Sequence, residues 1–137
     1  MNKKSIVAIE RIISCINELS ILTKGRDDNY FYDSFEMIAL LDLIYEIDRN
    51  INKISPKIKE KYSTIDWNVI ENRKHIDEKT GERWNSMNIG KAWELASGVI
   101  KDELLDKLNK LLENELPIYY TSYCNKIHEN AMKERNE

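Results

Sequence analysis

The strongest periodic signal in the sequence is an apolar stripe between residues 37 and 54. Its members recur at intervals of three or four residues, as side chains on one face of an α-helix do. They are Met37, Leu40, Leu41, Ile44, Ile47, Ile51 and Ile54. This spacing predicts a helix that starts near Asp33 or Ser34, ends near Ile54 and buries this face in a core.

Two other stretches carry stripes of the same kind. One runs from about Ser5 to Lys24, and the other runs from Ile100 to about Glu115, where Pro117 is expected to end the helix. Their inward positions are Ile6, Ile9, Ile13, Ile16 and either Leu19 or Ser20 in the first, and Leu104, Leu105, Leu108, Leu111 and Leu112 in the second. We expect the first of these helices to pack antiparallel on the central stripe.

Between the stripes, capping residues predict shorter helices. Ser55 followed by Pro56 begins one that covers Lys57 to about Tyr62, since serine is a good cap and proline fits the first helical position. Asp66 is expected to cap another that starts at Trp67. The pattern weakens over residues 73–88, and helix is expected again from Ile89, with a break near Ser97 and Gly98.

Composition supports an all-α fold in one small domain. The chain has 137 residues, of which only 4 are Gly and 2 are Pro, and so few turn-forming residues favour long helices with few connections. We therefore expect a four- to five-helix antiparallel bundle over residues 1–116. Residues 117–137 are expected to form a C-terminal helical extension that carries several tyrosines.

Charge and cysteine content narrow the function classes. A net charge of −3 provides no global field that attracts nucleic acid, so RNA binding requires a local patch. Cys15 and Cys124 are too few and too far apart for a disulfide framework or a zinc site, and Cys15 is expected in the core. No cofactor or metal is expected. Glu10, Arg11 and Asn17 interrupt the first apolar run, so we expect neither a signal peptide nor a membrane span. We therefore expect the protein to be cytoplasmic.

The order of several landmarks resembles the HepT-like (DUF86-type) branch of the HEPN superfamily. A long first helix ends at Thr23-Lys24-Gly25, and the second helix carries Asp42 and Glu46 one turn apart. The later landmarks are Ile54-Ser55, the stretches 57–62 and 65–70, the stretch 89–95 with its Trp93, and the leucine-rich helix 104–112. The resemblance covers roughly residues 5 to 115.

This resemblance implies a helical bundle that forms a homodimer in a toxin–antitoxin or phage-defence module. In active family members an arginine and, several residues later, a histidine cut RNA at the dimer cleft without a metal. The chemistry is intelligible, because a histidine near neutral pKa moves protons while an arginine holds the phosphate. The usual partner is a nucleotidyltransferase antitoxin, which can attach AMP to a tyrosine of the motif.

The sequence departs from the family pattern at this motif. Arg73 and His75 stand at the expected place, but only Lys74 separates them. On a continuing helix, residues two apart point about 200° apart, so they cannot converge on one phosphate within one chain. No tyrosine lies between Tyr62 and Tyr119, so the AMP-acceptor position is also vacant. Whether the protein is an enzyme therefore stays open.

Three interpretations of the segment 73–75 remain. It is a solvated helix end, or an RNA- or phosphate-binding patch in which Arg73 and Lys74 are joined by Lys79 and Arg83, or a rearranged active site completed by the second subunit. Asp42 and Glu46 are interpreted either as carboxylates that position the arginine or as surface charge, with Arg49 or Arg73 as the cation between them. The leading hypothesis is thus a toxin-like HEPN component, and the alternative is a catalytically inactive dimerisation or protein-binding module.

Overall fold

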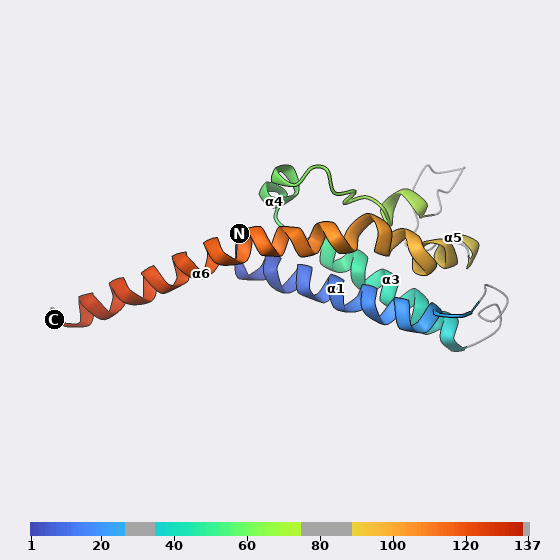
Figure 1. The fold of residues 1–137 in the computed structure, drawn as a ribbon, viewed down its shortest axis with the longest axis horizontal. Coiled ribbons are helices and arrows are strands. Elements are labelled where there is room, and N and C mark those ends of the chain that lie inside the picture. Colours follow the sequence, from blue (N-terminus) through green and yellow to red (C-terminus); the bar gives the residue numbers. More distant parts are fainter. Residues whose placement is uncertain (27–34, 75–88, 136–137) are drawn as a thin grey trace, which may run out of the picture.

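In the computed structural model, residues 1–26, 35–74 and 89–135 are described. Within these ranges every regular element is helical and no strand occurs, which confirms the predicted all-α class. Three long rods make up the molecule: two form a hairpin, and the third crosses it and continues well beyond the bundle (Figure 1).

The first rod, α1, spans Lys3–Thr23, close to the predicted range. Its start is fixed by Asn2, whose side-chain oxygen accepts a hydrogen bond from the Ser5 amide at 2.8 Å. Beyond its end, Gly25 has φ of 70°, a left-handed conformation that glycine adopts without steric cost. The chain can therefore leave the helix sharply at this point.

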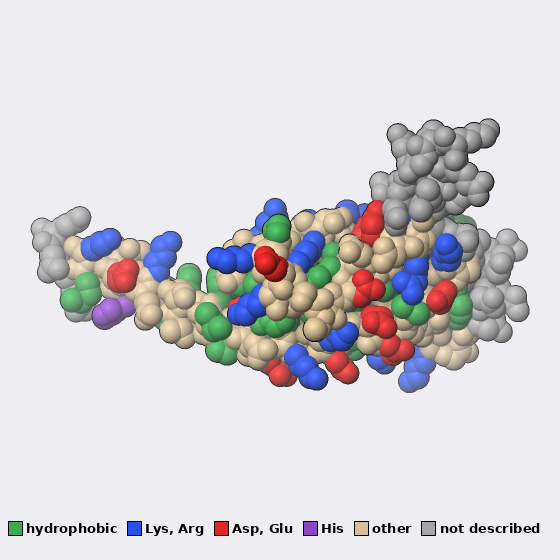
Figure 2. Space-filling model, turned by 90° about the horizontal axis from the view of Figure 1, so that it is seen from above, with side chains coloured by type: hydrophobic (Ala, Val, Ile, Leu, Met, Phe, Trp, Pro, Cys, Tyr) green, Lys and Arg blue, Asp and Glu red, His purple; other side chains and the backbone are tan. Residues whose placement is uncertain are grey.

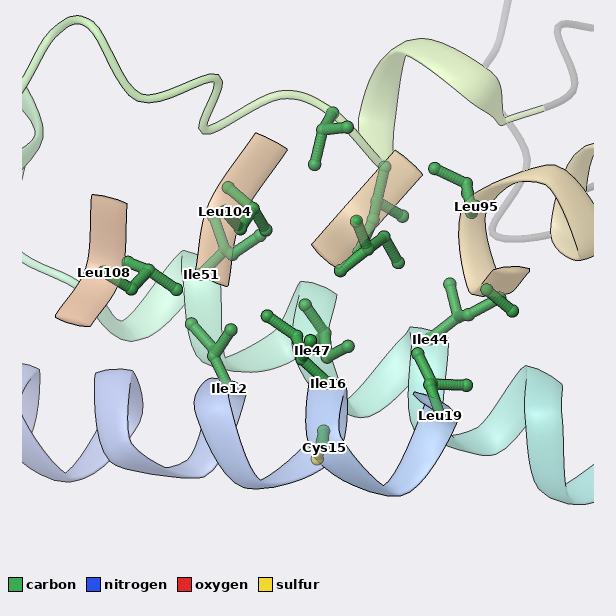
Figure 3. Packing of buried hydrophobic residues seen from close by; sticks show 14 of the residues in the cluster. Ile12, Cys15, Ile16, Leu19, Ile44, Ile47, Ile51, Leu95, Leu104 and Leu108 are labelled. Carbon is green, nitrogen blue, oxygen red and sulfur yellow. The ribbon is translucent and has the colours of Figure 1, made fainter. Parts of the chain in front are cut away.

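The second rod, α3, spans Phe35–Lys53 and runs back along α1 (Figure 1). Their facing side chains form the centre of the core, into which Cys15 is also packed, as expected (Figure 3). The apolar residues of this seam with at most 1% exposure are Ala8, Ile9, Ile12, Ile16, Leu19, Leu40, Ile44 and Ile47. The two predicted stripes therefore meet as expected, although Ile13 and Leu41 lie at the margin and are only partly buried.

A short helix, α4, spans Pro56–Lys61 and begins where the sequence predicted. Ser55 caps it, with its hydroxyl accepting from the Ile58 amide at 3.4 Å. The Ser55 amide donates in turn to the hydroxyl of Ser5, a fully buried side chain on α1, at 3.1 Å. This bond ties the turn after α3 to the start of α1.

The predicted helix beginning at Trp67 is absent; that prediction was wrong. Turns follow Asp66, and a single 3-10 turn, η1, spans Glu71–Arg73 before the chain becomes extended at Lys74. The side chain of Trp67 explains the difference, because its indole N–H points back to the carbonyl oxygens of Lys59 and Tyr62, both at 3.2 Å. The residue thus closes the end of α4 and does not start a new helix.

The third rod is continuous, so the predicted break near Ser97 and Gly98 is also wrong. It consists of α5 (Ile89–Glu94), two π-helical segments, η2 (Leu95–Val99) and η3 (Lys101–Leu105), and α6 (Asp106–Arg135). Its buried residues Ala96, Ile100, Leu104 and Leu108 follow one another in steps of four. In an α-helix each such step drifts by about 40°, and the wider π turns reduce this drift. The π segments therefore keep the apolar face directed at α1 and α3.

Pro117 lies inside α6 and does not end it, contrary to the prediction. Proline cannot donate a backbone hydrogen bond, so the carbonyl of Glu113 loses its helical partner and the helix bends, as Figure 1 shows. The Thr121 hydroxyl donates to the Pro117 carbonyl at 2.8 Å, a bond to the backbone of the preceding turn that often accompanies a bend in a helix. After the proline, α6 leaves the bundle.

Replacing Ile44 by Asp should unfold the domain. The side chain is 0% exposed at the centre of the α1–α3 seam, and a carboxylate buried there without a partner costs several kcal/mol, a large share of the stability of a small domain. The control is Ile38→Asp on the same helix, at a position 59% exposed. Urea unfolding followed by circular dichroism checks this, and a variant that keeps the wild-type midpoint at position 44 would refute the placement of this face.

Candidate functional site

The candidate site centres on Lys74, the middle residue of the basic segment singled out in the sequence. Its side chain is 5% exposed, and its ammonium lies 2.5 Å from Oδ2 of Asp48 on α3 and 2.9 Å from Oε2 of Glu71. A buried cation between two carboxylates is a stable arrangement only while all three groups remain together. The structure therefore makes Lys74 a structural link between η1 and α3.

The pKa of Lys74 reflects this environment. Burial lowers the pKa of the ammonium, but its hydrogen bonds to Asp48 and Glu71 outweigh that effect and hold the pKa above its ordinary value. Lys74 is consequently charged throughout the physiological range, and it serves as a fixed positive charge and not as a proton carrier.

Arg73 also forms an internal contact. One of its guanidinium nitrogens donates to the carbonyl oxygen of Val69 at 2.9 Å, and the residue is partly buried. His75, Lys79 and Arg83, the other residues of the predicted catalytic and RNA-binding sets, lie outside the described residues. Of the predicted basic patch, the structure therefore places Arg73 and Lys74, and it shows both bonded within the chain.

A polar hollow of about 600 Å³ lies beside this link. It is lined by Tyr45, Asp48, Arg49, Asn52, Glu71 and Lys74, which come from α3 and from the segment around η1. The carboxylates of Asp48 and Glu71 balance the cations of Arg49 and Lys74, so the hollow is mixed in charge. Such a lining is suited to polar contacts with a partner more than to holding a phosphate by charge alone.

Glu46, one of the two predicted supporting acids, pairs with Arg49, one of the two cations predicted beside it, and with Arg11. Its carboxylate accepts from Arg49 on the same helix and, at 3.4 Å, from Arg11 on α1. The hydrogen bond from Arg49 is the main reason that the pKa of Glu46 lies below its ordinary value, and the Asn50 amide at 3.2 Å adds to it. Asp42 is exposed, so of the two predicted acids one belongs to an ion-pair network and the other lies at the surface.

A buried acid, Glu115, holds α6 to α4. Its side chain is 3% exposed, and Oε1 accepts from the ammonium of Lys61 at 2.6 Å and from the hydroxyl of Tyr62 at 2.7 Å. The Lys61 hydrogen bond, followed by that of Tyr62, holds the pKa of Glu115 below its ordinary value in spite of burial. This cluster lies just before Pro117, where α6 leaves the bundle.

Reasoning from the sequence missed Asp48, Glu71 and Glu115. No local pattern connects Asp48 with Lys74, because their contact depends on how η1 meets α3. For Glu115 a signal was present, since it occupies the next inward position after Leu108 and Leu111 on the leucine-rich helix. An acid at an inward position predicts a buried ion pair.

On the face of the bundle that Figure 2 shows, acidic and basic side chains are interspersed. In the part of the chain that the structure describes, no group of three or more His, Cys, Asp or Glu residues is arranged to hold a metal ion. Among the same residues, none of the helices combines the length and the apolar character that crossing a membrane requires.

Comparison with known proteins adds no relative: the chain matches no family model, no curated protein and no solved structure.

Replacing Lys74 by Met should destabilise the fold by about 1–3 kcal/mol, because the substitution leaves Asp48, 14% exposed, without its closest cation. Chemical denaturation at neutral pH measures this, with the exposed Lys57→Met as the matched control. Equal midpoints for the two variants would show that the link carries no stability.

Since the pKa of Lys74 is raised in the fold, the contribution of Lys74 to the free energy of unfolding should be complete below about pH 10 and be lost as the pH rises further.

Glu115→Gln should flatten the acid limb of the stability curve. The pKa of Glu115 is lowered in the fold, so its contribution is present above the usual 4.5 and is lost as the pH falls through the lower folded value. At pH 7 the free energy of unfolding of the variant should be about 1–3 kcal/mol lower than that of wild type. As the pH falls from 5 to 3, this free energy should decrease less in the variant than in wild type. Glu113→Gln, an exposed position on the same helix, serves as the control in unfolding titrations across this range.

Proposed function

We propose that this chain is a HEPN-like helical bundle that acts in the cytoplasm as a dimerisation or protein-binding module, and that it is not an efficient ribonuclease. The bundle provides a rigid core, and the side chains exposed on its helices form the surfaces that bind a partner.

The observation that carries the proposal is the bonding of the basic segment. The metal-independent RNA cleavage that the family resemblance implies requires a cation that faces the phosphate and a histidine that reaches the 2′-hydroxyl or the leaving oxygen. Lys74 is instead buried between Asp48 and Glu71, and Arg73 donates to the Val69 carbonyl. Together with the single residue between Arg73 and His75, these contacts favour a structural role for the segment.

The resemblance to HepT-like proteins supplies the proposed setting. We infer a toxin-like component of a toxin–antitoxin or phage-defence module, which forms a homodimer and binds a nucleotidyltransferase-type antitoxin. On this resemblance alone, the subunit cleft is expected near Arg73 and His75.

RNA binding without cleavage is the second candidate function. The observation in its favour is the hollow beside Lys74, whose rim includes the guanidinium of Arg49, 62% exposed at its side chain. The mixed lining is suited to a sugar hydroxyl, and Arg49, which also donates to Glu46, can add a single contact to a phosphate.

A cleavage assay on mixed single-stranded RNA tests the first proposal. We expect purified protein to cleave at a rate indistinguishable from that of His75→Ala and Arg73→Ala, because removing a positioned acid or base from an active enzyme costs about a hundred- to ten-thousandfold in rate. Strong cleavage by the wild type that disappears in both variants would restore a rearranged active site and refute the proposal.

The same RNA, labelled with a fluorophore, distinguishes the second candidate by polarisation. RNA binding would be supported if affinity weakens in Arg49→Ala or Arg73→Ala and if the slope of log affinity against log salt concentration decreases by about one, the loss expected for one phosphate contact. Lys53→Ala, an exposed lysine on α3 outside the hollow's lining, is the control for nonspecific charge loss.

A further inference from the structure

The last turns of α6, residues 118–135, pass the first turns of α1 and then extend beyond the bundle (Figure 1); they are named here the distal helix. Large apolar side chains on it are half-exposed: Ile118, Tyr120, Tyr123, Ile127 and Met132. Tyr120, Tyr123 and Ile127 follow one another at three and four residues, so they form one stripe along the helix. Exposed apolar side chains in such a row mark an interaction surface.

The distal helix is poorly stabilised by itself. Its first turns contain Tyr119, Tyr120, Thr121, Ser122 and Tyr123, residue types that are weaker helix formers than alanine or leucine. A helix of about five turns with such a composition is marginal in water without tertiary contacts. A partner that covers the stripe would therefore stabilise the helix as well as bind it.

A groove adjoins the stripe where the distal helix passes the first turns of α1. It has a volume of about 320 Å³ and is lined by Lys3, Ile6, Val7 and Glu10 from α1 and by Tyr119, Tyr120 and Tyr123. Val7 is 54% exposed on one wall, and on the other wall the rings of Tyr119 and Tyr123 stack with centroids 6.3 Å apart. The floor is apolar, with a cation at one end of the α1 wall and a carboxylate at the other.

We propose that a second copy of this chain occupies this surface, with the two distal helices antiparallel and the outer turns of each lying over the groove of the other. The proposal rests on the dimerisation module inferred above and specifies its interface. It places the contact at the opposite end of the bundle from η1 and Arg73 (Figure 1), and so differs from the cleft that the family resemblance implies.

Self-complementarity of the stripe argues for a second copy. With a two-fold axis near Tyr123, the antiparallel arrangement brings Ile127 of one copy to Tyr119 and Tyr120 of the other, so that aliphatic meets aromatic surface twice. Both copies bury the same stripe, and neither leaves its apolar side chains in water.

The size of the surface is adequate for a dimer. About five turns of helix span about 27 Å, and each copy contributes both a stripe and a groove. The total contact is on the order of 1,000 Å², the scale above which specific interfaces are stable.

Sedimentation equilibrium of the full chain at tens of micromolar tests the proposal. Wild type and the control Ile21→Asp, at a position on α1 that is 77% exposed, should be dimers. Tyr123→Asp in the stripe and Val7→Asp in the groove should each raise the dimer dissociation constant at least about thirtyfold, as central interface residues do. Both positions are half-exposed, so unfolding curves of the isolated monomers should stay at the control value.

Cross-linking provides an independent readout. Cys124 is the exposed cysteine, next to the proposed two-fold axis, and Cys15 is buried. A short bismaleimide, which bonds one thiol at each end, should link two copies of the wild type and none of Cys124→Ser.

Three outcomes would overturn the proposal. They are a wild-type monomer, a dimer whose dissociation constant is unchanged in Tyr123→Asp and Val7→Asp, and cross-linking that persists in Cys124→Ser. A dimer that is insensitive to the two variants would leave the proposed dimerisation module standing with a different interface. Strong RNA cleavage, measured separately, would instead refute the module itself.

Discussion

The whole structure depends on the isoleucine seam between α1 and α3. Ile9, Ile12, Ile44 and Ile47 are each 0% exposed, and burying one such side chain fully contributes about 1.5–3 kcal/mol. The seam fixes the hairpin, and the hairpin provides the surface that the third rod covers with Leu95, Leu104 and Leu108 (Figure 3). The polar links at Lys74 and Glu115 attach the outer segments to this core and do not replace it.

Much of the fold could be predicted from the sequence, because α1 and α3 have long stripes that local spacing determines. Two of the three errors share a cause, which is that a tertiary contact overrode a local signal. Trp67 follows a good cap but folds back onto α4, and at Ser97 and Gly98, where a break was predicted, π turns adjust the register of the third rod to the core. Pro117 is different, because the helix continues past it by bending, with one backbone hydrogen bond lost.

The site was harder to predict than the fold. Arg73 and Lys74 were identified from the sequence, but their partners lie on another element or in the preceding turn, and spacing along the chain contains no information about which carboxylate a cation reaches. Asp48 is a surface-type residue that becomes mostly buried only when η1 packs beside α3. The burial of Glu115 was easier to predict, since its position on a leucine-rich face already implied it.

Pro117 and Glu115 together mark a mechanical boundary in α6. On one side the helix is held by the core and by the bonds of Glu115 to Lys61 and Tyr62. On the other side it lacks a backbone hydrogen bond and has few neighbours. Cooperative units in proteins separate where such contacts end, so the outer turns can fray and reform while the bundle stays folded. Amide hydrogens beyond the proline should therefore exchange with solvent faster than those before it. The two parts of the rod differ in local stability although they form one continuous helix.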